Sequence, residues 1–204
     1  GWPADPAMLG RPLVGMVSRL VDQKGFDLID GLGEELLALD ATFAVLGSGE
    51  ARYEQMWQAL ADRAPGRVAC RFGFDEGLAH LIEAGADIFL MPSKFEPCGL
   101  NQMYSMRYGT VPVVHAVGGL DDTVENWNRR TGSGTGFKFD AYTPDALRTT
   151  LQKALALWHK PESWRPVQQA GMKRDFSWDA SAAAYSAVYE AAIRARAKAD
   201  RGAE

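Results

Sequence analysis

The sequence has few cysteines and no long apolar run. Its 204 residues include only Cys70 and Cys98, and neither has a Cys-x-x-Cys or Cys/His spacing, so no disulfide framework, zinc site or redox motif is expected. No stretch approaches the roughly 20 apolar residues that cross a bilayer, so no membrane span is expected. Gly1 to Arg11 lacks the basic end, apolar stretch and cleavage site of a signal peptide, which predicts a cytoplasmic protein.

An excess of positive charge is also missing. The 22 Lys and Arg residues are outnumbered by 26 Asp and Glu, and they are scattered apart from a basic, Ala-rich tail at Arg194 to Arg201. A nucleic-acid partner is therefore not expected. With 47% hydrophobic and 24% charged residues, the chain has the composition of a globular protein. Its length is enough to bury a core, and we expect one domain over residues 1–204.

Short apolar runs alternate with amphipathic segments, a pattern that predicts an α/β fold, a Rossmann-like parallel sheet flanked by helices. Near-continuous apolar strands are typical of a sheet covered on both faces. The expected strands are Leu13 to Val17, Thr42 to Leu46, Val68 to Phe72, Ile88 to Met91, Val111 to Val114 and Phe137 to Phe139. The expected helices include a first one after Gly25, with Ile29, Leu32, Leu36 and Leu37 on one face, and others at about Ala51 to Ala64, Glu76 to Gly85, Leu100 to Tyr108 and Pro144 to Trp158. Only helices follow, from Glu162 to Lys173 and from Trp178 to about Lys198, with Ser177 or Asp179 as N-cap.

The loop after the first strand combines two cations with a glycine. Ligands of open parallel sheets bind at the carboxyl ends of the strands, so this is a place for an anion. Arg19 offers a planar fork of donors and Lys24 a mobile point charge, a pair suited to a diphosphate. The alternative is that both are solvated loop charges.

A stronger signal follows the fourth strand. Glu96 precedes a proline, and Gly99 is expected to open a helix whose free N–H groups, on Gly99, Leu100 and Asn101, can hold phosphate oxygens. A carboxylate beside a phosphate is repelled unless it faces another group, and a sugar hydroxyl is the natural partner. The alternative is that Glu96 only balances the helix dipole.

These loops carry a resemblance to the glycogen and starch synthase family. The matching segments are Val17 to Gly25, Pro92 to Leu100, Tyr108 to Val114, Gly118 to Val124, Gly136-Phe137 and Asp175 to Trp178, which together run along nearly the whole chain. The family has two Rossmann-like domains facing each other across a cleft, the GT-B arrangement, and the chain resembles the C-terminal one. The Lys-Thr-Gly-Gly-Leu loop of the family's N-terminal domain is absent from this sequence.

The resemblance implies roles for particular residues. Arg19 and Lys24 would hold the donor phosphates and stabilise the departing ADP, and Glu96 would contact the transferred glucose. The peptide groups of Gly99, Leu100 and Asn101 would take the distal phosphate, and the aromatic ring in Gly73-Phe74-Asp75 would stack on adenine. Phe74 replaces a frequent tyrosine, Asn101 a threonine of some relatives, and Lys94 an arginine of most. Tyr104 replaces a second glutamate of many retaining GT-B transferases, as it does in the synthases.

Weaker candidates surround the same loops. Cys98 has no His or Asp placed to make it a nucleophile, so we expect a packed loop residue that reacts with thiol reagents. Gly118 and Gly119 are expected to form a flexible loop before a capped helix start at Asp121 to Thr123. Gly118, Gly119 and Thr123 are expected to have a secondary role at the donor site. No metal site and no cofactor are expected.

The implied activity is transfer of glucose from ADP-glucose to the 4-hydroxyl at the non-reducing end of an α-1,4-glucan such as glycogen, with retention of configuration. The helices at about 162–198 would pack toward the missing N-terminal domain. Two alternatives remain. One is a different GT-B enzyme, such as a transferase with a UDP-linked donor, a phosphorylase or an epimerase. The other is a non-catalytic module that senses ADP or holds glucan.

Overall fold

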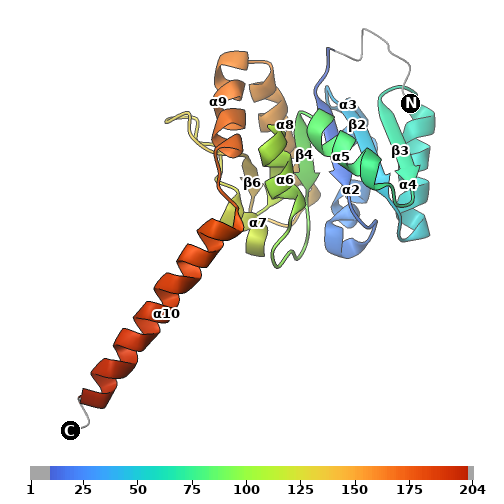
Figure 1. The fold of residues 1–204 in the computed structure, drawn as a ribbon. Helices are drawn as coiled ribbons and strands as arrows, with labels where there is room; N and C mark the ends of the chain where they lie inside the picture. The colour runs from blue at the N-terminus through green and yellow to red at the C-terminus, as the bar shows by residue number, and fades with distance from the viewer. Residues whose placement is uncertain (1–9, 202–204) are drawn as a thin grey trace. The chain divides into compact units, whose positions relative to one another are not determined.

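The computed structural model describes residues 10 to 201 (Figure 1). The N-terminal stretch discussed above, Gly1 to Leu9, and the last three residues of the expected domain lie outside the described residues. One six-stranded sheet forms the centre, with the order β3-β2-β1-β4-β5-β6 and parallel pairing throughout. The strands are β1 Leu13–Val17, β2 Thr42–Gly47, β3 Val68–Phe72, β4 Ile88–Met91, β5 Val111–His115 and β6 Phe137–Phe139.

Helices cover both faces of this sheet, as the apolar strands predicted. One layer holds α2 (Phe26–Leu32), α3 (Glu35–Ala38), α4 (Ala51–Arg63) and α8 (Pro144–Trp158). The other holds α5 (Glu76–Gly85), α6 (Asn101–Tyr108) and α7 (Gly118–Thr123). Helix α9 (Pro161–Met172) contacts both α6 and α8, and a short 3-10 helix, η1, spans Asp22–Lys24 before α2. The Rossmann-like prediction is confirmed.

The strands are held by a large core on the α8 side. Trp57, Tyr53, Phe26 and Phe43 are fully buried there, and a smaller cluster around Phe89 lies on the α5 side. Each large ring removes on the order of 150–250 Å² from water, which makes these side chains the main anchors of the sheet. The expected strand positions agree with the observed ones, with only β2 and β5 one residue longer.

Two helical segments differ from the sequence expectation. The helix after Gly25 stops at Leu32, because Gly33 takes a φ of 51° that right-handed helices do not use, and α3 resumes the path. Leu36 is nevertheless fully buried, so the expected apolar face is real although the helix is interrupted. Gly118 and Gly119 are not a flexible loop: they are the first two residues of α7.

The chain divides after Lys173 into two compact units, and the second contains α10, Trp178–Arg201. The Ser177 hydroxyl accepts a hydrogen bond from the Ala180 N–H at 3.3 Å, which confirms it as the N-cap. Several large apolar side chains of α10 are exposed: Trp178, Tyr185, Val188, Tyr189 and Ile193. No helix within residues 10 to 201 is both long and apolar enough to traverse a bilayer.

Candidate donor-binding site

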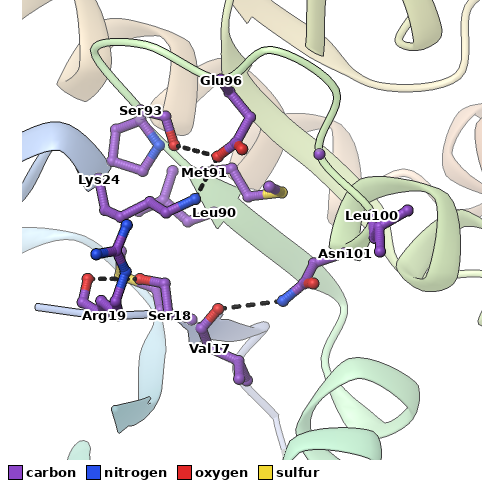
Figure 2. A pocket seen from close by; sticks show the side chains of 13 residues that line it. Val17, Ser18, Arg19, Lys24, Leu90, Met91, Ser93, Glu96, Leu100 and Asn101 are labelled. Atoms are coloured by element: carbon purple, nitrogen blue, oxygen red, sulfur yellow. Dashed lines mark hydrogen bonds and ion pairs between the residues drawn. The ribbon is translucent and has the colours of Figure 1, made fainter. Parts of the chain in front are cut away.

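A cavity of about 190 Å³ opens at the carboxyl ends of β1 and β4 (Figure 2). These two strands are neighbours although they are far apart in sequence, so the cavity lies where the strand order reverses. Such switch points are where open α/β sheets bind ligands. The lining combines residues from the β1 loop, the β4 loop and the start of α6: Met16, Val17, Ser18, Arg19, Lys24, Leu90, Met91, Pro92, Ser93, Glu96, Gly99, Leu100 and Asn101.

The β1 loop approaches the β4 loop very closely at Gly25. This glycine has a φ of 81°, and a Cβ there would overlap the carbonyl oxygen of Pro92, so no other residue fits without moving the loops. The close approach places Lys24 next to Glu96 of the β4 loop. Arg19 stays exposed, and its Nη2 donates to Gln23 Oε1 at 3.1 Å.

Lys24 and Glu96 point toward one another across the cavity in Figure 2. Lys24 Nζ lies 2.5 Å from Glu96 Oε2, and the Ser93 hydroxyl donates to the same oxygen at 3.3 Å. The Glu96 residue is only 8% exposed, so a lone carboxylate there would be costly without these partners. Sequence reasoning gave both residues a role at the site but missed this pairing.

The start of α6 supplies backbone donors. The helix begins at Asn101, two residues later than the Gly99 opening that the sequence suggested, because Gly99 turns the chain with a φ of 72° and Leu100 is the N-cap. Within the described part of the chain, the N–H groups of Gly99, Leu100 and Asn101 find no acceptor. The Asn101 side chain donates to the Val17 carbonyl at 3.1 Å and so ties α6 to β1.

The secondary candidates Cys98, Gly118, Gly119 and Thr123 lie next to this turn. A Cβ on Gly119 would overlap the Cys98 carbonyl oxygen, and one on Gly118 would overlap that of Glu96, so α7 packs directly on the β4 loop. Thr123 Oγ1 accepts from Gln102 Nε2 at 3.1 Å. Close packing is what requires glycine here. The Cys98 residue is exposed and does not line the cavity, contrary to the packed residue that was expected.

Gly73 and Phe74 stand apart from the cavity lining. They follow β3 at the same edge of the sheet, and Phe74 is 92% exposed. The Gly73 N–H donates to the Gly47 carbonyl at 3.1 Å, and no heavy atom of the described structure lies within 4 Å of a Cβ built on Gly73. The Phe74 ring is therefore open to contact with a ligand.

Two tyrosines donate hydrogen bonds to residues in and just after the β1 loop. The Tyr142 hydroxyl donates to Asp27 Oδ1 at 2.6 Å, and the Tyr53 hydroxyl donates to Asp22 Oδ1. Burial raises the pKa of both phenols, and the hydrogen-bonded carboxylates raise the pKa further. Both therefore stay protonated donors in the physiological range and hold the loop that carries Lys24. Nothing in the sequence marked these distant residues.

His115 connects the site to the neighbouring strand. Its Nδ1 lies 2.8 Å from the Ser93 carbonyl oxygen, which orients the β4 loop. Among residues 10 to 201, no group of three or more His, Cys, Asp or Glu side chains is arranged to hold a metal ion.

The chain is similar in sequence to known glycosyl transferases. The family model of glycosyl transferases group 1 matches residues 5–169. The glycogen synthase of Koribacter versatilis (strain Ellin345) is 53% identical over 186 residues, which are 91% of this chain and 38% of that protein. The glycogen synthase of Anaeromyxobacter dehalogenans (strain 2CP-1 / ATCC BAA-258) is 55% identical over 189 residues, 93% of this chain and 39% of that protein. The chain thus spans about two fifths of these relatives.

Solved structures show the same similarity. The catalytic domain of starch synthase IV from Arabidopsis thaliana, bound to ADP and acarbose, superposes with a TM-score of 0.77 at 33% identity, over 94% of this chain and 40% of that one. Sucrose-phosphate synthase from Thermosynechococcus elongatus has a TM-score of 0.68 at 22% identity, over 93% of this chain and 47% of that one, and supports the fold alone.

Proposed function

The chain belongs to the glycosyl transferases group 1, and from that premise we propose that it is the donor-binding domain of a glycogen synthase that uses ADP-glucose. The observation that carries the proposal is the cavity between β1 and β4. It gathers two cations, one carboxylate and a row of N–H groups without an acceptor in the described structure. That set suits a sugar diphosphate, because the diphosphate needs positive charge and N–H donors while the sugar needs an acceptor for its hydroxyls.

The difficult step in this transfer is the departure of the nucleoside diphosphate. Breaking the anomeric C–O bond builds negative charge on the diphosphate and positive charge on the sugar. Arg19, Lys24 and the N–H groups before α6 are placed around one cavity, so they stabilise the leaving group without a large rearrangement. Preorganised donors of this kind are typically the largest single contribution to catalysis.

The ion pair between Lys24 and Glu96 lets opposite charges share the site. An ammonium group has three N–H donors, and Lys24 uses one of them on Glu96, so two remain for phosphate oxygens. Glu96 keeps its second oxygen for a sugar hydroxyl. The carboxylate is thereby neutralised on the side that faces the diphosphate, which removes the repulsion that an unpaired carboxylate would cause.

The nucleotide base would lie beyond the phosphates, on the exposed ring of Phe74. Stacking needs an open aromatic face, and a phenyl ring provides it as well as a phenol. Two similarities support ADP-glucose as donor and an α-1,4-glucan as acceptor: the starch synthase IV structure is bound to ADP, and the relatives at 53–55% identity are glycogen synthases.

The sugar side of the site would be completed by a second, N-terminal domain in a GT-B enzyme. The relatives are much longer than this chain, which leaves room for such a domain. The exposed apolar side chains of α10 give that helix a surface suited to packing against it. We place the enzyme in the cytoplasm and assign retention of configuration to the transfer.

A calorimetric titration of the 204-residue chain with ADP and with UDP tests the donor assignment. We expect tighter binding of ADP, because the larger purine covers more of the Phe74 ring. Arg19→Ala is the matched control: it should weaken both nucleotides by a similar factor, since both carry the diphosphate. Equal affinity for the two nucleotides, or a preference for UDP, would contradict the assignment.

A further inference from the structure

Gln23 connects the two loops that form the cavity without lining the cavity itself. Its side-chain Oε1 accepts from Arg19 Nη2 at 3.1 Å, and its Nε2 donates to the Phe95 carbonyl at 3.3 Å. Its backbone carbonyl accepts from the Lys94 N–H at 2.9 Å. One residue of the β1 loop is therefore bonded three times to groups that surround the candidate phosphate site.

These contacts fix which way the amide of Gln23 faces. If the amide were turned over, its NH2 group would meet the guanidinium of Arg19, donor against donor, and its oxygen would meet the Phe95 carbonyl oxygen. Both contacts would be repulsive, so the hydrogen-bond network allows one orientation. In that orientation the oxygen faces Arg19 and holds its guanidinium.

We propose that Gln23 is a positioning residue that orders Arg19 for the phosphates of the donor, an inference that rests on the proposed function. Arg19 is exposed, and within residues 10 to 201 its guanidinium makes no ion pair. A long flexible cation of this kind loses conformational entropy when it binds a ligand. Gln23 removes part of that cost by restricting the side chain before the ligand arrives.

The same bridge couples Arg19 to the loop that carries Glu96. Phe95 precedes Glu96, and its carbonyl is the acceptor for the other end of the Gln23 amide. A shift of the β4 loop therefore moves the group that holds Arg19. Through Gln23, the cation for the phosphate and the carboxylate for the sugar keep a defined separation.

A double-mutant cycle tests the proposal. ADP affinity is measured by calorimetry for the wild-type chain, Gln23→Ala, Arg19→Ala and the double variant. Gln23→Ala should weaken ADP binding roughly two- to tenfold, the cost of ordering one flexible side chain. In the Arg19→Ala background the same change should alter ADP affinity by less than about twofold, because the side chain that Gln23 orders is gone; twofold is about the margin within which independent changes add.

Gln23→Met separates hydrogen bonding from packing. Methionine keeps the length of the side chain but neither accepts from Arg19 nor donates to Phe95, so we expect the same loss as with alanine. Gln58→Ala is the matched control, because Gln58 is an exposed amide on α4 whose Nε2 donates to Asp62 at 2.8 Å and which does not line the cavity. It should leave ADP affinity unchanged.

The outcomes distinguish this inference from the proposed function. If the wild-type chain fails to bind ADP, the donor-site assignment fails and the inference falls with it. If ADP binds and Arg19→Ala weakens it, but Gln23→Ala costs the same in both backgrounds, Gln23 acts on the loops and not through Arg19, and the inference alone is overturned. Wild-type affinity in Gln23→Met would overturn it as well.

Discussion

The phosphate side and the base side of the candidate site are built differently. On the phosphate side, Lys24 is tied to Glu96, Asn101 to Val17, and the loops touch at a glycine that leaves no free space. On the base side, Phe74 is 92% exposed, and a Cβ on Gly73 would meet no heavy atom of the described residues within 4 Å. The side chains of the first region contact one another, whereas the Phe74 ring is open to solvent.

The difference indicates where recognition and where catalysis reside. A transition state that develops charge on a diphosphate is stabilised best by groups that are already in place, which is the state of the phosphate side. A nucleotide base binds by stacking on the face of an aromatic ring, and this contact does not require the ring to be fixed before the ligand binds. We therefore expect mutations on the two sides to separate effects on protein stability from effects on nucleotide binding.

The largest expected effect is a complete loss of transfer in the isolated chain. It should bind ADP but incorporate no labelled glucose from ADP-glucose into glycogen, because the sugar side of the cleft is open to water. Correct positioning of the reacting groups can account for roughly 7–11 kcal/mol of barrier lowering, and the open half-site forgoes much of it.

The control for this assay is the intact two-domain protein, measured with the same donor and glycogen preparation. The intact protein carrying Arg19→Ala gives the transfer rate that remains when one contact to the phosphates is lost. Clear turnover by the isolated chain would mean that its own residues complete the active site, and the two-domain account would have to be abandoned.

The second prediction contrasts the two cations of the phosphate side. Both Arg19→Ala and Lys24→Ala should weaken ADP binding by about 1.5–3 kcal/mol, the usual value of a charge-assisted hydrogen bond. Only Lys24→Ala should also lower the free energy of unfolding, by about 1–3 kcal/mol, because it leaves the buried Glu96 carboxylate without its charged partner, with only the Ser93 hydroxyl bonded to it. Exposed Arg19 should change stability by less than about 0.5 kcal/mol.

Urea unfolding and calorimetric titration measure the two quantities on the same samples. The double variant Lys24→Ala with Glu96→Gln should recover part of the lost stability, since the unpaired charge is gone, but should not recover ADP binding. Equal unfolding free energies for Lys24→Ala and the wild-type chain would show that the ion pair contributes nothing to the fold.

Much of the fold was predictable from local pattern. The strands are continuous apolar runs bounded by turns, and this signal predicted the positions of all six strands of the sheet within residues 10 to 201. The candidate cations and Glu96 were predictable because strand ends in such a sheet converge on one edge. The interruption at Gly33 was not, since a glycine within an amphipathic pattern gives no indication of its φ.

The contacts inside the site could not be predicted because they join distant loops. The pairing of Lys24 with Glu96 spans 72 residues, and the role of Gln23 depends on a backbone carbonyl that any residue would supply. The packing of α7 on the β4 loop likewise appears only when the two backbones meet at Gly119. Side-chain chemistry identifies candidates, but their partners follow from tertiary structure.

The smallest expected effect concerns the base side. Phe74→Ala should lower ADP affinity by about 1 kcal/mol, the lower end of what stacking on one base contributes, and should leave the free energy of unfolding unchanged because the ring is 92% exposed. Phe74→Tyr should keep the affinity, since both rings offer the same face. Leu81→Ala is the matched control, an exposed apolar side chain of α5 that does not line the cavity and should affect neither quantity. A loss of stability in Phe74→Ala would mean that the ring packs against the chain, and unchanged ADP affinity would remove Phe74 from the binding site and place the base elsewhere.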